Sequence, residues 1–166
     1  MNIDRRLLAL ALTFLGVSIP SFSQGPACSN RLIAGDYSYT CTGMVVLQDG
    51  TPPVPIAILG VAYGDADGNW RGAATMSLNG TMMPQFSTTD PSLGGKPAVV
   101  KKDCTGTITY QTYLDSNHTQ PLGPLPINFV IMNDGNELKG LPTNQGYTVT
   151  CHLVRQWFKD LPKDRD

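Results

Sequence analysis

The sequence contains few charged residues and few side chains that could act as a catalytic acid or base. Charged residues make up 15% of the 166 positions, Glu137 is the one glutamate, and the two histidines are His118 and His152. The formal net charge is -1 at pH 7, and the chain has no long run of Lys or Arg. Binding of nucleic acid or of an anionic membrane through charge requires a basic surface. We therefore expect neither kind of partner.

The sequence also lacks the motifs of nucleophilic catalysis. No Gly-x-Ser-x-Gly element is present. His118 lies in a loop segment, and His152 falls on the threonine face of a predicted strand. A catalytic triad would need a serine and an acid placed around one of these rings. Surface histidines are the simpler interpretation, so the sequence predicts no catalytic residue, and a non-enzymatic protein is favoured.

A metal site is not predicted either. Segment 65–69 reads Asp-x-Asp-x-Asn and begins like a calcium-binding loop. Such a loop needs glycine at its sixth position and glutamate at its twelfth, where this chain has Trp70 and Met76. A hairpin turn accounts for the same residues. We therefore expect no metal and no cofactor.

The chain has a single long apolar stretch without charge, and this stretch lies at the N-terminus. Arg5 and Arg6 precede residues 7–19, and residues 21–23 place small side chains at the positions that a signal peptidase selects. The stretch is too short to cross a bilayer, which takes about 20 residues. This layout predicts a cleaved signal peptide over residues 1–23 and a secreted or periplasmic protein without a transmembrane segment.

The remaining chain is long enough for one compact core. We expect residues 24–157 to form a single β domain and residues 158–166 to form a charged tail that frays. A lipid attached at Cys28 is the rival to cleavage after Ser23, but the residues before this cysteine fit a lipidation signal poorly.

Four cysteines remain after the signal peptide, namely Cys28, Cys41, Cys104 and Cys151. An even number in an exported chain predicts two disulfides, for which three pairings are possible. No C-x-x-C element is present, and the spacings match no zinc site. The spacing alone does not choose among the three pairings.

Apolar and polar residues alternate along several segments with the period of two that is typical of half-buried strands. These segments are 36–47, 70–78, 104–114 and 147–153. Two further segments, 56–63 and 127–132, are apolar on both faces, which predicts strands whose outer face is also covered. A short helix over 155–160 is the best helical candidate.

Turn residues separate these segments. Asp67-Gly68, Asn79-Gly80 and Asp134-Gly135 predict tight hairpins. Asn79 and Asn117 also match the N-glycosylation pattern, which would matter only in a eukaryotic secretory pathway. Longer loops are expected over residues 51–55, 90–97 and 120–126.

Seven to nine short strands joined by hairpins predict an all-β fold. We expect a small antiparallel up-and-down β-barrel of about eight strands, with a β-sandwich as the alternative. Pairing the first strand with the last would close such a barrel and remove its exposed edges.

Four short motifs are spread over this chain. They are Cys28-Ser29-Asn30, Gly35-Asp36-Tyr37, residues 103–107 (Asp-Cys-Thr-Gly-Thr) and residues 134–138 (Asp-Gly-Asn-Glu-Leu). In these motifs the chain resembles a family of small exported bacterial proteins that has no agreed activity. The resemblance covers nearly the whole mature chain and implies a barrel of lipocalin-like or allene-oxide-cyclase-like shape. It also implies the disulfides Cys28–Cys104 and Cys41–Cys151.

The segment Gly35-x-Tyr37 is also similar to the lipocalin Gly-x-Trp pattern at the start of the first strand. Arg155, just after the last strand, stands where lipocalins place an arginine that stacks on that aromatic ring. The resemblance therefore implies a contact between Tyr37 and Arg155.

Seven aromatic side chains fall on faces that we expect to point inward, namely Tyr37, Tyr39, Trp70, Phe86, Tyr110, Phe129 and Tyr147. The interior of an eight-stranded barrel is either filled by side chains or holds one small ligand. A filled core is the default. If the barrel is hollow, these aromatic residues are the candidate ligand-binding residues.

Three functions remain open. The first is a non-enzymatic exported barrel that binds a small apolar or aromatic ligand. The second is a cyclase-type enzyme, and the third is an extracellular or cell-surface interaction module. An open aromatic cavity would favour the first two, a buried His, Asp or Arg within it would favour the enzyme, and a solid core with an exposed apolar patch would favour the module.

Overall fold

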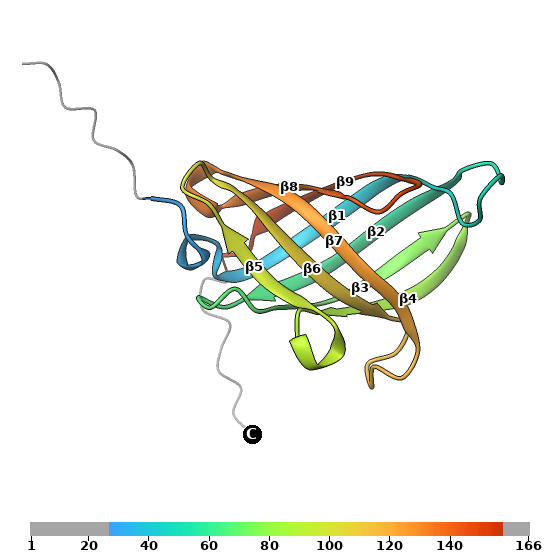
Figure 1. Ribbon diagram of the computed structural model, residues 1–166, viewed down its shortest axis with the longest axis horizontal. Coiled ribbons are helices and arrows are strands. Elements are labelled where there is room, and N and C mark those ends of the chain that lie inside the picture. Colours follow the sequence, from blue (N-terminus) through green and yellow to red (C-terminus); the bar gives the residue numbers. More distant parts are fainter. Residues whose placement is uncertain (1–26, 158–166) are drawn as a thin grey trace, which may run out of the picture.

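Alternating polar and apolar residues fold into nine β-strands that close into a barrel, as the computed structural model shows for residues 27–157 (Figure 1). The strands are β1 (Gly35–Val45), β2 (Val54–Gly64), β3 (Trp70–Leu78), β4 (Thr81–Thr88), β5 (Lys96–Val100), β6 (Thr105–Tyr113), β7 (Pro121–Met132), β8 (Glu137–Pro142) and β9 (Tyr147–Arg155). The short 3-10 helices are η1 (Asn30–Ile33), η2 (Pro91–Leu93) and η3 (Asn133–Gly135). The predicted signal peptide (1–23) and tail (158–166) lie outside the described residues.

The nine strands occupy eight positions around the barrel. Antiparallel neighbours follow the order β4-β3-β2-β1-β9-β8-β7-β6, and β4 pairs with β6 to close the ring. Both β4 and β5 pair along β6, one after the other, so they form one strand position interrupted by η2. The predicted antiparallel barrel of about eight strands is therefore confirmed, including the pairing of the first strand with the last.

Strand β7 begins earlier than its sequence predicts. Residues 120–126 were expected to form a loop because they contain three prolines, yet β7 already starts at Pro121. This half of β7 pairs with β6 on one side, whereas β8 joins it only from Ile127 onward. A proline lacks a backbone donor and is tolerated where the strand has no ladder on its second side. The turn after β8 covers this side instead, since the Thr143 amide donates to the Pro126 carbonyl at 2.9 Å.

Strand β2 shows that an apolar outer face need not be covered. Its segment 56–63 is apolar on both faces, and we expected a second covering element. Leu59, Val61 and Tyr63 instead point outward and are 65%, 59% and 42% exposed. The inner residues Ile56 and Ile58 are buried, so the strand is half-buried like its neighbours.

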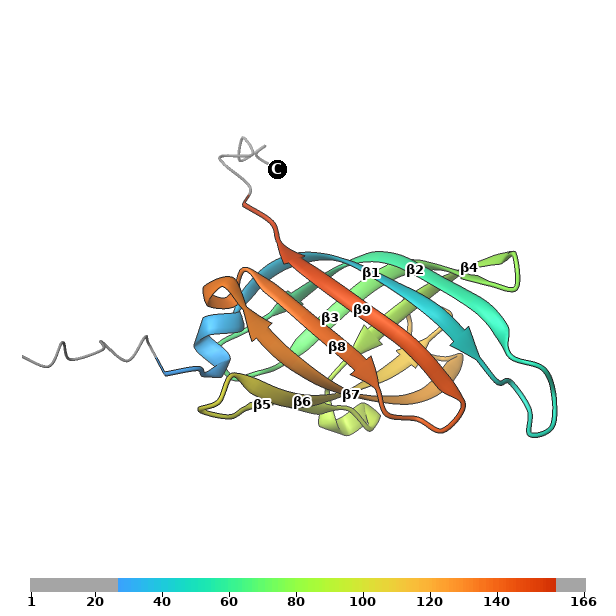
Figure 2. The ribbon, with the colours of Figure 1, turned by 90° about the horizontal axis from the view of Figure 1, so that it is seen from above.

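Helix η1 seals one end of the barrel, at the left of Figure 2. Ile33 of η1 has no exposed surface and packs into the core. The Asn30 side-chain amide donates to the Ala98 carbonyl of β5 at 3.0 Å. Gly135 of η3 approaches Leu32 so closely that no side chain would fit there. The β1–β2, β3–β4 and β8–β9 connections lie at the opposite end of the barrel.

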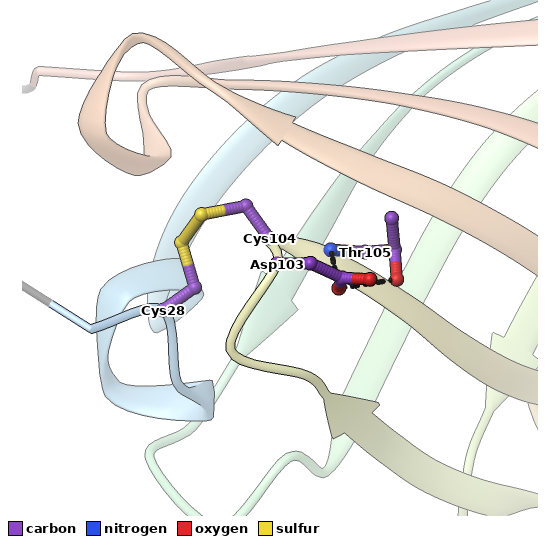
Figure 3. Close-up of a disulfide and its surroundings, with 4 residues drawn as sticks. All are labelled: Cys28, Asp103, Cys104 and Thr105. Atoms are coloured by element: carbon purple, nitrogen blue, oxygen red, sulfur yellow. Dashed lines mark hydrogen bonds between the residues drawn. A yellow bond between two sulfur atoms is a disulfide. The ribbon is translucent and has the colours of Figure 1, made fainter.

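Two disulfides reinforce this arrangement, and they are the pairs that the family resemblance implied, Cys28–Cys104 and Cys41–Cys151. The first fastens the segment before η1 to the turn after β5 (Figure 3). Asp103 shapes that turn, because its carboxylate accepts hydrogen bonds from the Thr105 amide and hydroxyl at 3.1 and 2.7 Å. The second bridge crosses from β1 to β9.

Within residues 27–157, no helix is both long and apolar enough to pass through a lipid bilayer.

Candidate functional site

The barrel encloses an apolar cavity of ≈ 80 Å³, which we call the lumen. Side chains from every strand except β5 line it, and Ile33 of the η1 plug also borders it. Tyr147 lines the lumen at the opposite end and is 37% exposed, so the lumen reaches the surface there. A site for one water needs about 10–15 Å³, and an engineered cavity that takes up benzene has about 150 Å³. The lumen is therefore partly filled and has room for a small or narrow molecule.

Glycines on neighbouring strands determine where the rings of Phe129 and Trp70 lie. Phe129 of β7 stands directly opposite Gly106 of β6 and Gly140 of β8. A Cβ atom on Gly106 would come closer than 3.0 Å to three carbons of the Phe129 ring. Trp70 lies over Gly64 of β2, its partner in the register, in the same way. Because these glycines have no side chain, both rings lie against the barrel wall.

Tyr37 and Arg155 close the plugged end through a buried network. The Tyr37 hydroxyl donates to the Gly135 carbonyl at 2.6 Å and accepts from Arg155 Nη2 at 2.8 Å. The same Nη2 also donates to the Leu32 carbonyl of η1 at 2.5 Å. Burial raises the pKa of Tyr37, and the guanidinium partly opposes this shift. The contact between Arg155 and Tyr37 that the lipocalin-like pattern implied is thus present, with the guanidinium 5.3 Å from the ring centroid.

Five of the seven predicted aromatic residues line the lumen. They are Tyr39, Trp70, Tyr110, Phe129 and Tyr147. Tyr37 is fully buried but belongs to the network at the plugged end, where its ring centroid is 5.3 Å from that of Trp70.

The expectation that Phe86 points inward is wrong. Gln85 and Ser87 line the lumen, so the alternation along β4 turns Phe86 to the outer surface. There it borders a surface groove together with Val61 and His118. Sequence reasoning assigned the aromatic residue to the core and thereby reversed the two faces of this strand.

Two buried polar atoms at the lumen lack a hydrogen-bond partner within the described part of the chain. Gln85 is 7% exposed and its Oε1 atom is unpaired, and the same holds for Nε1 of Trp70, which is 3% exposed. The phenols of Tyr39 and Tyr110 also line the lumen. Burial raises the pKa of Tyr39 to about 12. It raises the pKa of Tyr110 as well, with a further contribution from nearby Tyr39.

Gln85 is a polar lumen residue that sequence reasoning missed. A glutamine in a strand normally faces water, so its side chain gave no signal of an inward position. The one available signal was its spacing from Ser87, which places the two polar residues on the same face of β4.

Neither histidine borders the lumen. His118 lies in the β6–β7 loop with its ring 4.6 Å from that of Tyr113. His152 lies on the outer surface, where its Nε2 is 3.1 Å from Glu137 Oε2. Hydrogen bonds from His152 and from Asn133 lower the pKa of Glu137. None of the lumen-lining side chains in residues 27–157 is an Asp, Glu, Lys, Arg or His.

The segment that resembles the start of a calcium loop forms the β2–β3 turn. The Asp65 carboxylate accepts hydrogen bonds from the amides of Asp67 and Asn69, each at 2.9 Å, and from the Asn69 side chain at 2.9 Å. These bonds, led by the one from the Asn69 side chain, lower the pKa of Asp65. The carboxylate therefore serves the backbone of the hairpin, as the turn interpretation predicted.

No family model, no curated protein and no solved structure matches this chain. The case for a function therefore comes from the lumen itself.

Proposed function

We propose that the protein is an exported, disulfide-bonded barrel that binds a small apolar ligand in its lumen. The observation that carries this proposal is the placement of Phe129 and Trp70 over glycines on adjacent strands. In a barrel of this size side chains can fill the interior completely. Here the rings of Phe129 and Trp70 lie along the wall, and apolar space remains beside them.

The two ends of the barrel support the same interpretation. Helix η1, the Arg155 network and the Cys28–Cys104 bridge close one end. The lumen reaches the surface at the other end, beside Tyr147. A barrel that is closed at one end and open at the other is better suited to binding and retaining a ligand than to letting it pass through.

Export to an oxidising compartment, outside the cell or in the periplasm, is part of this proposal. Disulfides persist in such compartments, and residues 1–23 have the layout of a secretory signal. We also infer that the chain belongs to the family of small exported bacterial proteins that it resembles. The motif at residues 103–106 supports this, because Asp103 shapes the turn, Cys104 anchors the plug and Gly106 accommodates Phe129.

The two alternative functions lack a comparable observation. A cyclase-type enzyme would be favoured by a buried His, Asp or Arg at the lumen, and the side chains that line it in residues 27–157 include none. An interaction module would be favoured by a solid core together with an exposed apolar patch. Leu59, Val61 and Tyr63 are exposed, but side chains fill the core only in part.

Tryptophan fluorescence gives a direct test. The chain has two tryptophans, of which Trp70 borders the lumen and Trp157 is 72% exposed. In a Trp157→Phe background, Trp70 becomes the sole reporter. We expect toluene, used as a small apolar probe, to change the Trp70 emission in a saturable manner, and native mass spectrometry to show a one-to-one complex.

A matched pair of variants on β7 controls for non-specific uptake. Ile127→Phe adds a ring to the lumen, whereas Val130→Phe adds one to the outer face, where Val130 is 43% exposed. The inward variant should lose toluene binding and the outward one should keep it. The proposal is overturned if the parent protein takes up no probe or if both variants bind toluene equally.

A further inference from the structure

The chemical class of ligand that the lumen accepts can be inferred from its lining, and this inference rests on the proposed function. The lumen combines apolar walls with the polar groups described above, and the two features constrain the ligand differently. The walls set its shape and its hydrocarbon character. The polar groups set the atoms that it must present.

The first constraint is on charge. None of the lumen-lining side chains in the described range ionises near neutral pH, and burial raises the pKa of Tyr39 and Tyr110 still further above that range. Arg155, at the plugged end, is engaged with Tyr37 and the Leu32 carbonyl. A carboxylate or an ammonium group in the lumen would lose its hydration without meeting an opposite charge. The ligand is therefore uncharged.

The second constraint comes from Gln85, Tyr39 and Tyr110. The pairing register places Tyr39 opposite Gly60, Gly60 opposite Ala74, and Ala74 opposite Gln85. Tyr39 and Gln85 thus lie at the same level of the barrel, and the two positions between them are Gly60 and Ala74. The Tyr110 phenol extends into the lumen near that of Tyr39.

The buried Gln85 Oε1 without a partner is the observation that requires a ligand group. Leaving such an atom unpaired is unfavourable because its lost hydration is not replaced, and the surrounding lumen walls are apolar. The amide offers both an acceptor and a donor, and each phenol can donate or accept. A hydroxyl or a carbonyl on the ligand would satisfy these groups.

We propose that the lumen binds an uncharged, narrow, hydrocarbon-rich molecule with one hydroxyl or carbonyl group, which hydrogen-bonds to Gln85 and to the hydroxyls of Tyr39 and Tyr110. The class includes small alcohols, ketones and phenols. It excludes ionised fatty acids and amines.

The test compares three probes in the Trp157→Phe background: toluene, 1-hexanol and hexanoate. We expect 1-hexanol to bind and hexanoate, ionised at neutral pH, to bind about 100-fold more weakly or not at all, because burying an unpaired charge costs several kcal/mol. Tyr39→Phe, Tyr110→Phe and Gln85→Leu each remove one polar group without adding bulk. Each should weaken 1-hexanol binding about 2- to 10-fold while toluene binding stays the same or tightens.

Tyr63→Phe is the matched control, because Tyr63 lies on the outer face of β2 and is 42% exposed. This variant should bind 1-hexanol and toluene like the parent. The polar-group proposal is overturned if hexanoate binds as well as 1-hexanol, or if the lumen variants change toluene and 1-hexanol binding equally. A protein that binds none of the three probes would instead overturn the proposed function.

Discussion

Cys41 of β1 lies directly opposite Cys151 of β9, with their Cα atoms 4.0 Å apart. Such a short distance is typical of the non-hydrogen-bonded pairs of an antiparallel ladder, where side chains approach most closely. The bridge therefore joins the first and last strands at the seam where an up-and-down barrel closes. Both cysteines also line the lumen, so the bridge forms part of its wall.

Removal of the seam bridge in Cys41→Ala/Cys151→Ala should destabilise the barrel by about 4 kcal/mol, because the bridge closes a loop of 110 residues in the unfolded chain. Urea unfolding followed by circular dichroism measures this change. The Cys28→Ala/Cys104→Ala variant, whose bridge spans 76 residues, should lose nearly as much by the same reasoning. A loss below about 1 kcal/mol in both variants would contradict this account.

Arg155→Lys should loosen the plugged end. The guanidinium donates to the Tyr37 hydroxyl through both Nε and Nη2 and to the Leu32 carbonyl through Nη2, and the single nitrogen of a lysine lacks this planar arrangement, so we expect a loss of about 1–3 kcal/mol. Hydrogen exchange should increase first at the amides of η1. The control is Arg71→Lys, because Arg71 is exposed on the outer face and stacks over Tyr63. Equal effects of the two substitutions would show that the Arg155 network does not hold the plug.

Stability should fall at alkaline pH because of Tyr39. Its pKa is raised by burial to about 12, whereas a tyrosine in the unfolded chain ionises at about 10. The folded state therefore favours the neutral phenol. This contribution, about 2–3 kcal/mol, is fully present below about pH 10 and is lost as the pH rises to about 12. Urea unfolding at a series of pH values should show this fall in the parent protein and a shallower one in Tyr39→Phe. An identical pH dependence in both proteins would contradict the prediction.

The sequence was sufficient to predict the closed barrel because apolar and polar residues alternate clearly along strands such as β1 and β3. Tyr37, Cys41 and Val45 recur on the inner face of β1, and Trp70 and Met76 on that of β3. The period of two distinguishes these faces without knowledge of the neighbouring strands. The turn residues then fixed where one strand ended and the next began.

The candidate site was predictable only in part, because its key features depend on the pairing register. Gly106 and Gly140 matter through their position opposite Phe129, and no property of the isolated segments shows this. The faces of β4 were assigned incorrectly, because its aromatic residue points outward and Gln85 points inward. Tertiary structure reversed the usual preference there, and such local departures are expected at functional sites.

The placement of Phe129 over Gly106 can be tested by a double-mutant cycle. In Gly106→Ala, the added methyl group must displace the Phe129 ring toward the lumen. We expect this overpacking to cost about 1–3 kcal/mol and to reduce toluene binding, because the displaced ring occupies the space of the probe. Urea unfolding and the Trp70 fluorescence titration measure the two effects.

The second half of the cycle replaces the Phe129 ring by the smaller aliphatic side chain of leucine. Phe129→Leu alone should lower stability by removing buried contacts, since Phe129 is 8% exposed. In the double variant, the smaller leucine leaves room for the alanine methyl group, so the loss should be about 0.5–3 kcal/mol less than the sum of the single losses. Toluene binding should also recover relative to Gly106→Ala. Strictly additive losses, with binding unaffected in every variant, would mean that the glycine has another structural role and does not keep the lumen open.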